Sequence, residues 1–88
     1  MKIEFRRSFS KDLKQIQDKA LLKRVQEIVE EIETAATLHE IASVKKLRGS
    51  ESYYRIRVGD YRVGLRIEAE TVIFVRFLHR RDIYRYFP

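Results

Sequence analysis

The stretch YYRIRVGDYRV, residues 53–63, constrains the fold of this chain more than any other feature of its sequence. Apolar residues alternate with other residues on both sides of Gly59-Asp60. This is the pattern of two β-strands joined by a two-residue turn with glycine in the first position. Such a turn fixes the register of the hairpin. The predicted apolar face pairs Val58 with Tyr61, Ile56 with Val63, and Tyr54 with Leu65.

The opposite face of this hairpin is predicted to be cationic. It pairs Arg57 with Arg62, Arg55 with Gly64, and Tyr53 with Arg66. Like charges directly across two strands destabilise a sheet, so their presence calls for a reason. Guanidinium groups match the geometry of phosphate, which favours a phosphate-binding face. The alternative is structural: the arginine stems cover apolar sheet while their charged ends stay in water.

The run TVIFVRFLH, residues 71–79, is predicted to form the next strand, and it allows two registers. One register buries Val72, Phe74, Arg76 and Leu78. The other buries Ile73, Val75 and Phe77. Because burying an unpaired arginine costs free energy, we favour the second register. It requires an odd-numbered loop such as Ala69-Glu70-Thr71, and it directs Arg76 and Arg80 to the cationic face, with Arg76 near Gly64.

The N-terminal half reads as one strand and two helices. KIEFR alternates as a short strand, and apolar residues then recur at helical spacing over about 10–19 and 20–36. Ser8 or Ser10 is the expected N-cap of the first helix and Asp18 that of the second. The connector after residue 36 has an extended piece at Val44–Leu47, and RRDIYRYFP ends the chain as a short strand or a turn of helix. We therefore predict an α+β fold in which a two-helix hairpin packs on a twisted antiparallel sheet of about four strands, in the order β-α-α-β-β-β.

Length and composition limit the classes of protein that are possible. The 88 residues are enough for one domain, residues 1–88, and 36% of them are charged. Residues 1–44 hold eight basic and eight acidic residues, whereas residues 45–88 hold eleven and five, so the whole excess charge of +6 lies in the second half. This asymmetry favours a polyanionic partner. Without cysteine, a signal segment, a long apolar run or clustered histidines, we expect a cytoplasmic protein with no metal, no cofactor and no membrane contact.

Three motifs in order, KKLRG, YYRIRVGDYRVGLRI and LHRRDIY, resemble the RelE/ParE toxin superfamily of type II toxin–antitoxin modules over nearly the whole chain. The resemblance implies a RelE-like microbial RNase type of fold. For the RelE branch it implies a ribosome-dependent mRNA endonuclease, active without metal, which cuts in the A site by attack of the ribose 2′-OH on the adjacent phosphate. The implied partners are the ribosome, its mRNA and a cognate antitoxin that neutralises the toxin.

The same resemblance implies the site residues. Arg57 and Arg55 match sheet positions that are lysine in the best-known members, Arg62 matches a family arginine, and Arg80 with Tyr84 matches the C-terminal arginine and tyrosine. His79 is the histidine next to this set, and it is either a proton-transfer group or an ordinary strand-end residue. The predicted catalytic set is Arg57, Arg62, Arg80, Tyr84 and His79. The predicted RNA-binding set is Lys45, Lys46, Arg48, Arg55, Arg76 and Arg81.

Two other functions remain open from the sequence. One is a non-enzymatic inhibitor of DNA gyrase, as in the ParE branch, whose members generally lack the set Arg57, Arg62, Arg80 and Tyr84. The other is an RNA-binding domain without catalysis, which would carry the same phosphate patch. The antitoxin would dock in an apolar groove between the helices and the sheet edge, lined by Phe9, Leu13, Leu22 and Val29, unless these residues are simply core.

Overall fold

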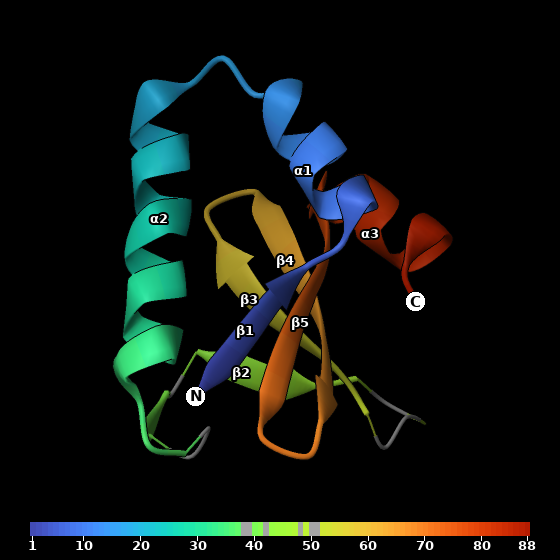
Figure 1. Ribbon diagram of the computed structural model, residues 1–88. Coiled ribbons are helices and arrows are strands. Elements are labelled where there is room, and N and C mark those ends of the chain that lie inside the picture. Colours follow the sequence, from blue (N-terminus) through green and yellow to red (C-terminus); the bar gives the residue numbers. More distant parts are fainter. Residues whose placement is uncertain (38–39, 42, 48, 50–51) are drawn as a thin grey trace.

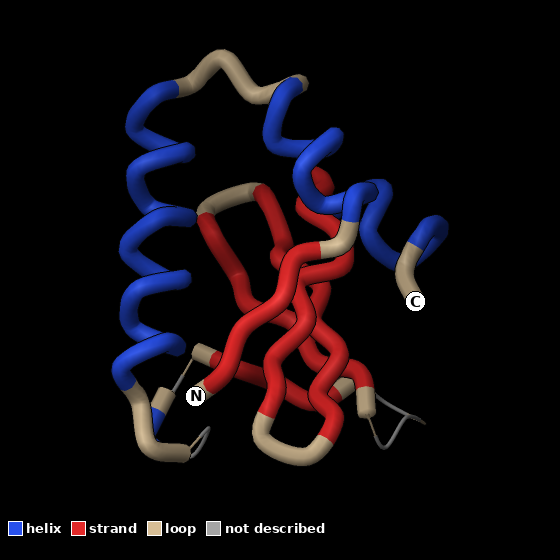
Figure 2. The backbone as a smooth tube through the Cα atoms, in the orientation of Figure 1, coloured by secondary structure: helices blue, strands red, loops and turns tan. Residues whose placement is uncertain are grey.

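The computed structural model describes residues 1–37, 40–41, 43–47, 49 and 52–88. Its elements are β1 (Lys2–Phe5), α1 (Arg7–Lys14), α2 (Lys19–Thr34), β2 (Val44–Lys46), β3 (Tyr53–Val58), β4 (Tyr61–Glu68), β5 (Thr71–His79) and α3 (Arg80–Tyr86). Five strands form one mixed sheet in the order β1-β5-β4-β3-β2 (Figures 1 and 2). The α+β prediction is confirmed, with β2 added at one edge and β1 pairing parallel to β5 at the other.

The hairpin of β3 and β4 has the register that the sequence predicts. Ile56 pairs with Val63 on the core face and Arg57 pairs with Arg62 on the other. The turn residue Gly59 has a φ of 60°, whereas Asp60 has no positive φ, as a type II′ turn requires. The alternation of side chains therefore decides both faces of the central sheet.

The register of β5 differs from the prediction. Strands β4 and β5 are joined by a two-residue turn, in which Ala69 has a φ of 53°, so Val72 and Phe74 lie on the core face. The register then shifts between Gly64 and Leu65, which leaves Val75 as an extra residue in β5. This β-bulge returns Phe77 to the core face and places Arg76 opposite Gly64. We expected the loop to shift the alternation of side chains by one residue, but this shift lies in the middle of β5 instead.

Helices α1 and α2 cover the core face of the sheet. The core combines the apolar face of α2, formed by Val25, Ile28 and Ile32, with residues from the strands such as Ile56 and Leu65. The two helices diverge from the loop that joins them, and α1 packs along β5 (Figure 1). The expected close helix hairpin is therefore an open pair in which each helix contacts the sheet.

One of the two predicted N-caps is confirmed and the other is wrong. Asp18 caps α2 as expected, because its side chain accepts hydrogen bonds from the backbone N–H groups of Ala20 and Leu21 at 3.0 and 3.1 Å. The prediction for α1 is wrong, since this helix begins earlier, at Arg7, and its N-cap residue Arg6 makes no side-chain cap bond. The hydroxyl of Ser8 donates instead to the Val75 carbonyl at 2.6 Å.

Helix α3 covers part of the opposite face of the sheet. Phe87, which follows it, is buried against Gly64, and a Cβ added at Gly64 would lie 2.8–2.9 Å from the Phe87 ring. The Tyr53 ring meets the Phe87 ring edge to face at 5.4 Å between centroids. Ile73 and Ile83 are buried as well, outside the main core cluster. The face that the sequence presents as cationic is therefore apolar at one end.

We expect Gly64→Ala to destabilise the fold by about 1–3 kcal/mol, because the added methyl group overlaps the Phe87 ring. The free energy of unfolding in urea measures this. Phe87→Ala removes the overlapping ring, so the double variant should lose clearly less stability than the sum of the two single variants. Strict additivity would contradict the contact.

Candidate functional site

The cationic side chains gather at the end of the sheet next to the β3–β4 turn. Arg57 is exposed and directly opposite Arg62. The backbone N–H of Arg80 donates to the Asp60 carbonyl at 2.7 Å, which brings the first residue of α3 to the same turn. The structure therefore assembles Arg57, Arg62 and Arg80 from three elements at one place.

Arg62 is held in place by the hairpin itself. Its Nη1 donates to the carbonyls of Gly59 and Tyr61 at 3.1 and 2.8 Å. Its Nε is buried and has no hydrogen-bond partner in the structure as described. An unsatisfied buried donor costs free energy, so this position of Arg62 is not explained by stability alone. Arg62 is thus a partly buried cation with a fixed orientation and spare hydrogen-bonding capacity.

Tyr84 and Arg55 extend this set along the sheet. Tyr84, on α3, is 61% exposed, and the Arg55 guanidinium lies 6.0 Å from the centre of its ring, within reach of a cation–π contact. Lys45 on β2 pairs with Arg55 and so shares its face. We call Arg55, Arg57, Arg62, Arg80 and Tyr84 the arginine face.

His79 does not join the arginine face. It pairs with Tyr61, on the core side of the sheet, and the two rings meet edge to face at 5.4 Å. Its Nδ1 accepts hydrogen bonds from the backbone N–H and the Nε of Arg81, at 3.1 and 3.3 Å. The histidine is therefore the N-cap of α3. Its role is to begin the helix that carries Tyr84.

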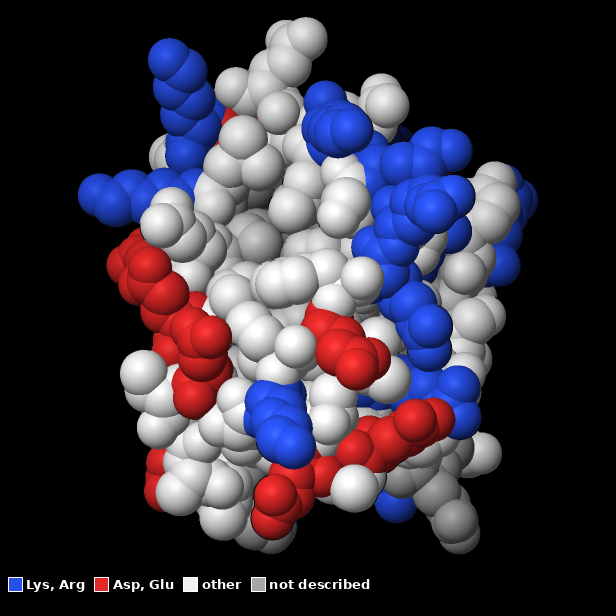
Figure 3. Space-filling view, viewed as in Figure 1, with Lys and Arg blue, Asp and Glu red and all other residues white. Residues whose placement is uncertain are grey.

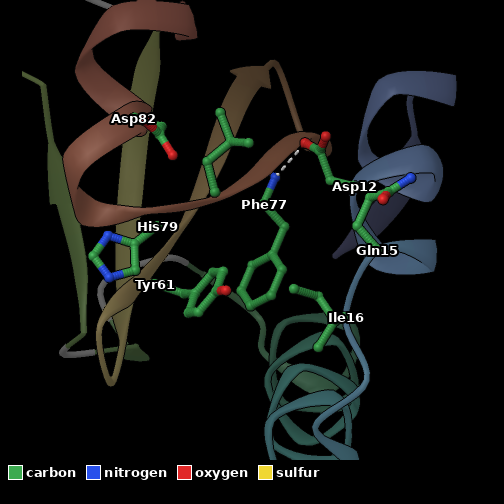
Figure 4. Close-up of a pocket in the computed structure, with 8 residues that line it drawn as sticks. Asp12, Gln15, Ile16, Tyr61, Phe77, His79 and Asp82 are labelled. Carbon is green, nitrogen blue, oxygen red and sulfur yellow. Dashed lines mark hydrogen bonds between the residues drawn. The ribbon is translucent and has the colours of Figure 1, made fainter.

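Figure 4 shows the surroundings of His79. A pocket of about 200 Å³ is lined by residues of α1, the loop after it, β4, β5 and α3: Asp12, Gln15, Ile16, Tyr61, Phe77, Leu78, His79 and Asp82. None of these residues belongs to the arginine face. In the described parts of the chain, no group of three His, Cys, Asp or Glu side chains is placed to hold a metal ion.

Arg76 is tied up in the structure. Its Nε and Nη2 donate to the two carboxylate oxygens of Asp12 at 2.7 and 3.1 Å, and the same carboxylate accepts the Phe77 N–H at 2.9 Å. These hydrogen bonds raise the pKa of the Arg76 guanidinium above its ordinary value, although partial burial acts in the opposite direction. Arg76 therefore joins α1 to β5, and its guanidinium is not free to bind phosphate.

The remaining predicted RNA-binding residues are scattered. Lys46 pairs with Tyr54 and so projects from the opposite face to Lys45. Arg81 is exposed, but its side chain is bonded to His79. Arg48 lies outside the described residues. Of the six, Lys45 and Arg55 lie with the arginine face.

The predicted apolar groove is largely core. Phe9 is 1% exposed and belongs to the main cluster, and Leu13 and Val29 pack against that cluster. Leu22 is half-buried.

Among the described residues, no helix is long and apolar enough to cross a membrane.

Sequence reasoning missed Asp12 and Phe87. Asp12 is the one acidic residue of α1, and its position among basic residues was the feature of the sequence that could have pointed to it. Nothing in the alternation of residues 53–79 points to Phe87, because its contact with Gly64 joins the end of the chain to the middle of the sheet.

Residues 3–84 match the family described as the ParE toxin of the type II toxin–antitoxin system parDE. The chain is 44% identical over 89 residues to the toxin RelE3 of Methanocaldococcus jannaschii, with 100% of both sequences covered. Two of the solved structures that share its fold are antitoxin–toxin complexes. One is a RelB–RelE antitoxin–toxin complex from Methanococcus jannaschii (TM-score 0.82, 42% identity, 97% and 99% covered). The other is an archaeal RelE–RelB complex from Pyrococcus horikoshii OT3 (TM-score 0.72, 25% identity, 90% and 93% covered).

We expect Asp12→Ala to lower the free energy of unfolding by about 2–3 kcal/mol, because it leaves Arg76 and the Phe77 N–H without their acceptor in a half-buried place. Urea unfolding measures the change. The control is Glu68→Gln, which breaks the exposed pair with Arg66 and should cost less than about 1 kcal/mol. Equal losses in the two variants would show that the Asp12 pair has no special structural role.

Proposed function

Because the chain belongs to the RelE/ParE toxin superfamily of type II toxin–antitoxin modules and is a toxin of RelE type, we propose that it is an endoribonuclease that cuts mRNA in the ribosomal A site. The observation that carries this proposal is the arginine face. Arg57, Arg62 and Arg80, from β3, β4 and α3, meet at the β3–β4 turn, and the exposed Tyr84 lies beside Arg55 on the same face. Such an arrangement costs stability unless an anion occupies it.

The reaction adds negative charge where these arginines lie. The ribose 2′-oxygen attacks the adjacent phosphorus, a phosphorane forms, and the bond to the 5′-oxygen of the next nucleotide breaks to leave a 2′,3′-cyclic phosphate. The exposed Arg57 and Arg80 bind the phosphate, and Arg62, already oriented by the hairpin carbonyls, donates to the phosphorane. Preorganised donors of this kind stabilise the transition state more than the ground state.

Proton transfer needs a group outside this set. Arginine stays protonated throughout the pH range in which proteins fold, because its pKa lies far above neutrality. His79 faces the other side of the sheet and caps α3. We therefore assign the arginine face to binding and charge stabilisation. We assign both the acceptor of the 2′-OH proton and the donor of a proton to the leaving 5′-oxygen to the assembled complex with ribosome and mRNA.

We also propose that a cognate antitoxin binds and neutralises this chain. The related RelE toxins of known structure are in complex with RelB antitoxins. A protein that cuts mRNA during translation is compatible with growth of its own cell only while it is held inactive.

The second candidate is inhibition of DNA gyrase without catalysis, which the match to the ParE family favours. The arginine face distinguishes the two, because a site that stabilises a phosphorane serves cleavage. Primer extension on mRNA in programmed ribosomes, beside the same mRNA free of ribosomes, decides between them. We expect cuts at the A-site codon only when ribosomes are present. Uncut mRNA together with inhibited supercoiling by gyrase would establish the second candidate.

We expect Arg57→Ala and Arg80→Ala each to slow this cleavage about 100-fold or more, because each removes a donor to the charge that develops on phosphorus. Both side chains are exposed, so the melting temperature should stay within about 2 °C of the original protein. The control is Arg24→Ala on α2, another exposed arginine, which should cut at the original rate. If Arg57→Ala and Arg80→Ala both keep full activity, the arginine face takes no part in the reaction.

Tyr84 offers a test of base stacking. We expect Tyr84→Phe to keep most of the affinity for the ribosome–mRNA complex, since the phenyl ring can still stack on a base. We expect Tyr84→Ala to lose about 1–3 kcal/mol of binding. Binding to ribosomes programmed with 2′-O-methylated mRNA, which cannot be cut, measures both. Equal losses in the two variants would assign the role to the hydroxyl group instead.

A further inference from the structure

Helix α1 carries a second basic surface that the arginine face does not include. Arg7, Lys11 and Lys14 follow at spacings of four and three residues, which places them on one side of the helix. All three are exposed. The opposite side of α1 carries the buried Phe9 and the half-buried Leu13, which face the core. We call Arg7, Lys11 and Lys14 the α1 ridge.

The charge on this ridge is not balanced by its own helix. The one acidic residue of α1, Asp12, is bonded to Arg76 and the Phe77 N–H on β5. Helix α2 is different, because its exposed cations near the N-terminus are followed by Glu27, Glu30 and Glu31. Figure 3 shows the contrast: Asp and Glu gather on the left-hand side of the view, over α2 and below two cations at its upper end, whereas Lys and Arg predominate toward the upper right, where Figure 1 places α1 and α3.

Two features of the ridge lower the stability of α1. Arg7 and Lys11 are like charges four residues apart, which repel each other on a helix surface. Arg7 is also a cation in the first turn, where the helix dipole favours an anion, and that turn contains no acidic residue and no side-chain cap. Residues that weaken their own helix in this way are expected at a functional surface.

We propose that the α1 ridge binds the phosphate backbone of a structured RNA. The ridge extends over about 10 Å of helix, given a rise of about 1.5 Å per residue, and so can reach several successive phosphates. Lysine suits this role because it acts as a compact point charge toward phosphate. The partner is an RNA and not a protein, because the large exposed hydrophobic side chains of the described residues, Phe5, Tyr84 and Tyr86, all lie outside α1. Protein interfaces have an apolar centre.

The α1 ridge and the arginine face are separate surfaces. Helix α1 lies along the edge of β5, in the layer of helices that covers the core face. The arginine face lies on the other side of the sheet, with Arg57 opposite Arg62. The two surfaces can therefore hold two different parts of an RNA assembly at once. The ridge anchors the protein on folded RNA, while a flexible strand enters the arginine face.

The test is binding to an RNA hairpin with a stem of about 16 base pairs, the length that a double-strand-binding domain spans. The hairpin is 2′-O-methylated so that it cannot be cut, and fluorescence anisotropy is measured over a series of salt concentrations. The ridge variant is Arg7→Gln/Lys11→Gln/Lys14→Gln. The matched control is Lys19→Gln/Lys23→Gln/Arg24→Gln, which removes the same charge from three exposed residues of α2.

We expect the ridge variant to bind at least about 10-fold more weakly, and the slope of log affinity against log salt to become shallower by about 2–3, because three phosphate contacts are lost. The control should stay within about threefold of the original protein. The single variant Lys11→Gln, with a slope shallower by about one, keeps the test valid if the triple variant does not fold.

Three outcomes would overturn the proposal. The ridge variant and the control lose equal affinity, which would indicate a general effect of net charge. The ridge variant keeps the affinity of the original protein. The ridge variant keeps its affinity for the hairpin but loses the cognate antitoxin, which would make the ridge a protein-docking surface. The assay involves no cleavage, so the binding result can be interpreted even if the protein proves not to be a nuclease.

Discussion

The carboxylate of Asp12 joins the parts of this small protein that the sheet alone does not hold together. It accepts two hydrogen bonds from Arg76 and one from the backbone of Phe77, in a place where the Asp12 side chain is 12% exposed. Strand β1 pairs with β5 only as far as Phe74. Beyond that point Ser8 and Asp12, one helical turn apart on α1, satisfy backbone groups of β5. Helix α1 thus closes an edge that would otherwise be unpaired.

The same ion pair links the two faces of the sheet. The Arg76 guanidinium lies 6.0 Å from the centre of the Tyr86 ring, at the end of α3. Phe87 then packs on Gly64, which anchors the helix against the sheet. At its other end α3 is capped by His79 and bonded to the β3–β4 turn through Arg80. These contacts at both ends of α3 place Tyr84 beside Arg55, so the packing of α3 on the sheet determines where the tyrosine of the arginine face lies.

The cations of this protein fall into two groups: those that stabilise the fold and those that are available to bind an anion. Arg76 stabilises the fold, and its charge is already matched by a carboxylate. Arg57 and Arg80 are exposed, and Arg62 is fixed by carbonyls; in the part of the chain that the structure describes, no carboxylate pairs with Arg62. The basic residues of α1 face solvent beyond the core. Cations that lack an acidic partner are the ones that a polyanion can use, because their pairing adds a contact without breaking another.

The central hairpin follows from the sequence, since alternation over residues 53–66 leaves one register in which apolar side chains share a face. Local patterns also indicated the cap at Asp18 and the shared face of Arg55, Arg57 and Arg62, whereas Tyr84 was expected from the family resemblance. The remaining features depend on tertiary packing. The bulge at Val75 appears because Phe74 and Phe77 both reach the core, and an odd spacing cannot do this in a regular strand. His79 and Arg76 read as site residues in the sequence, yet one caps α3 and the other binds Asp12, 64 positions away. Pairings over such distances depend on how the helices pack, which no local pattern contains.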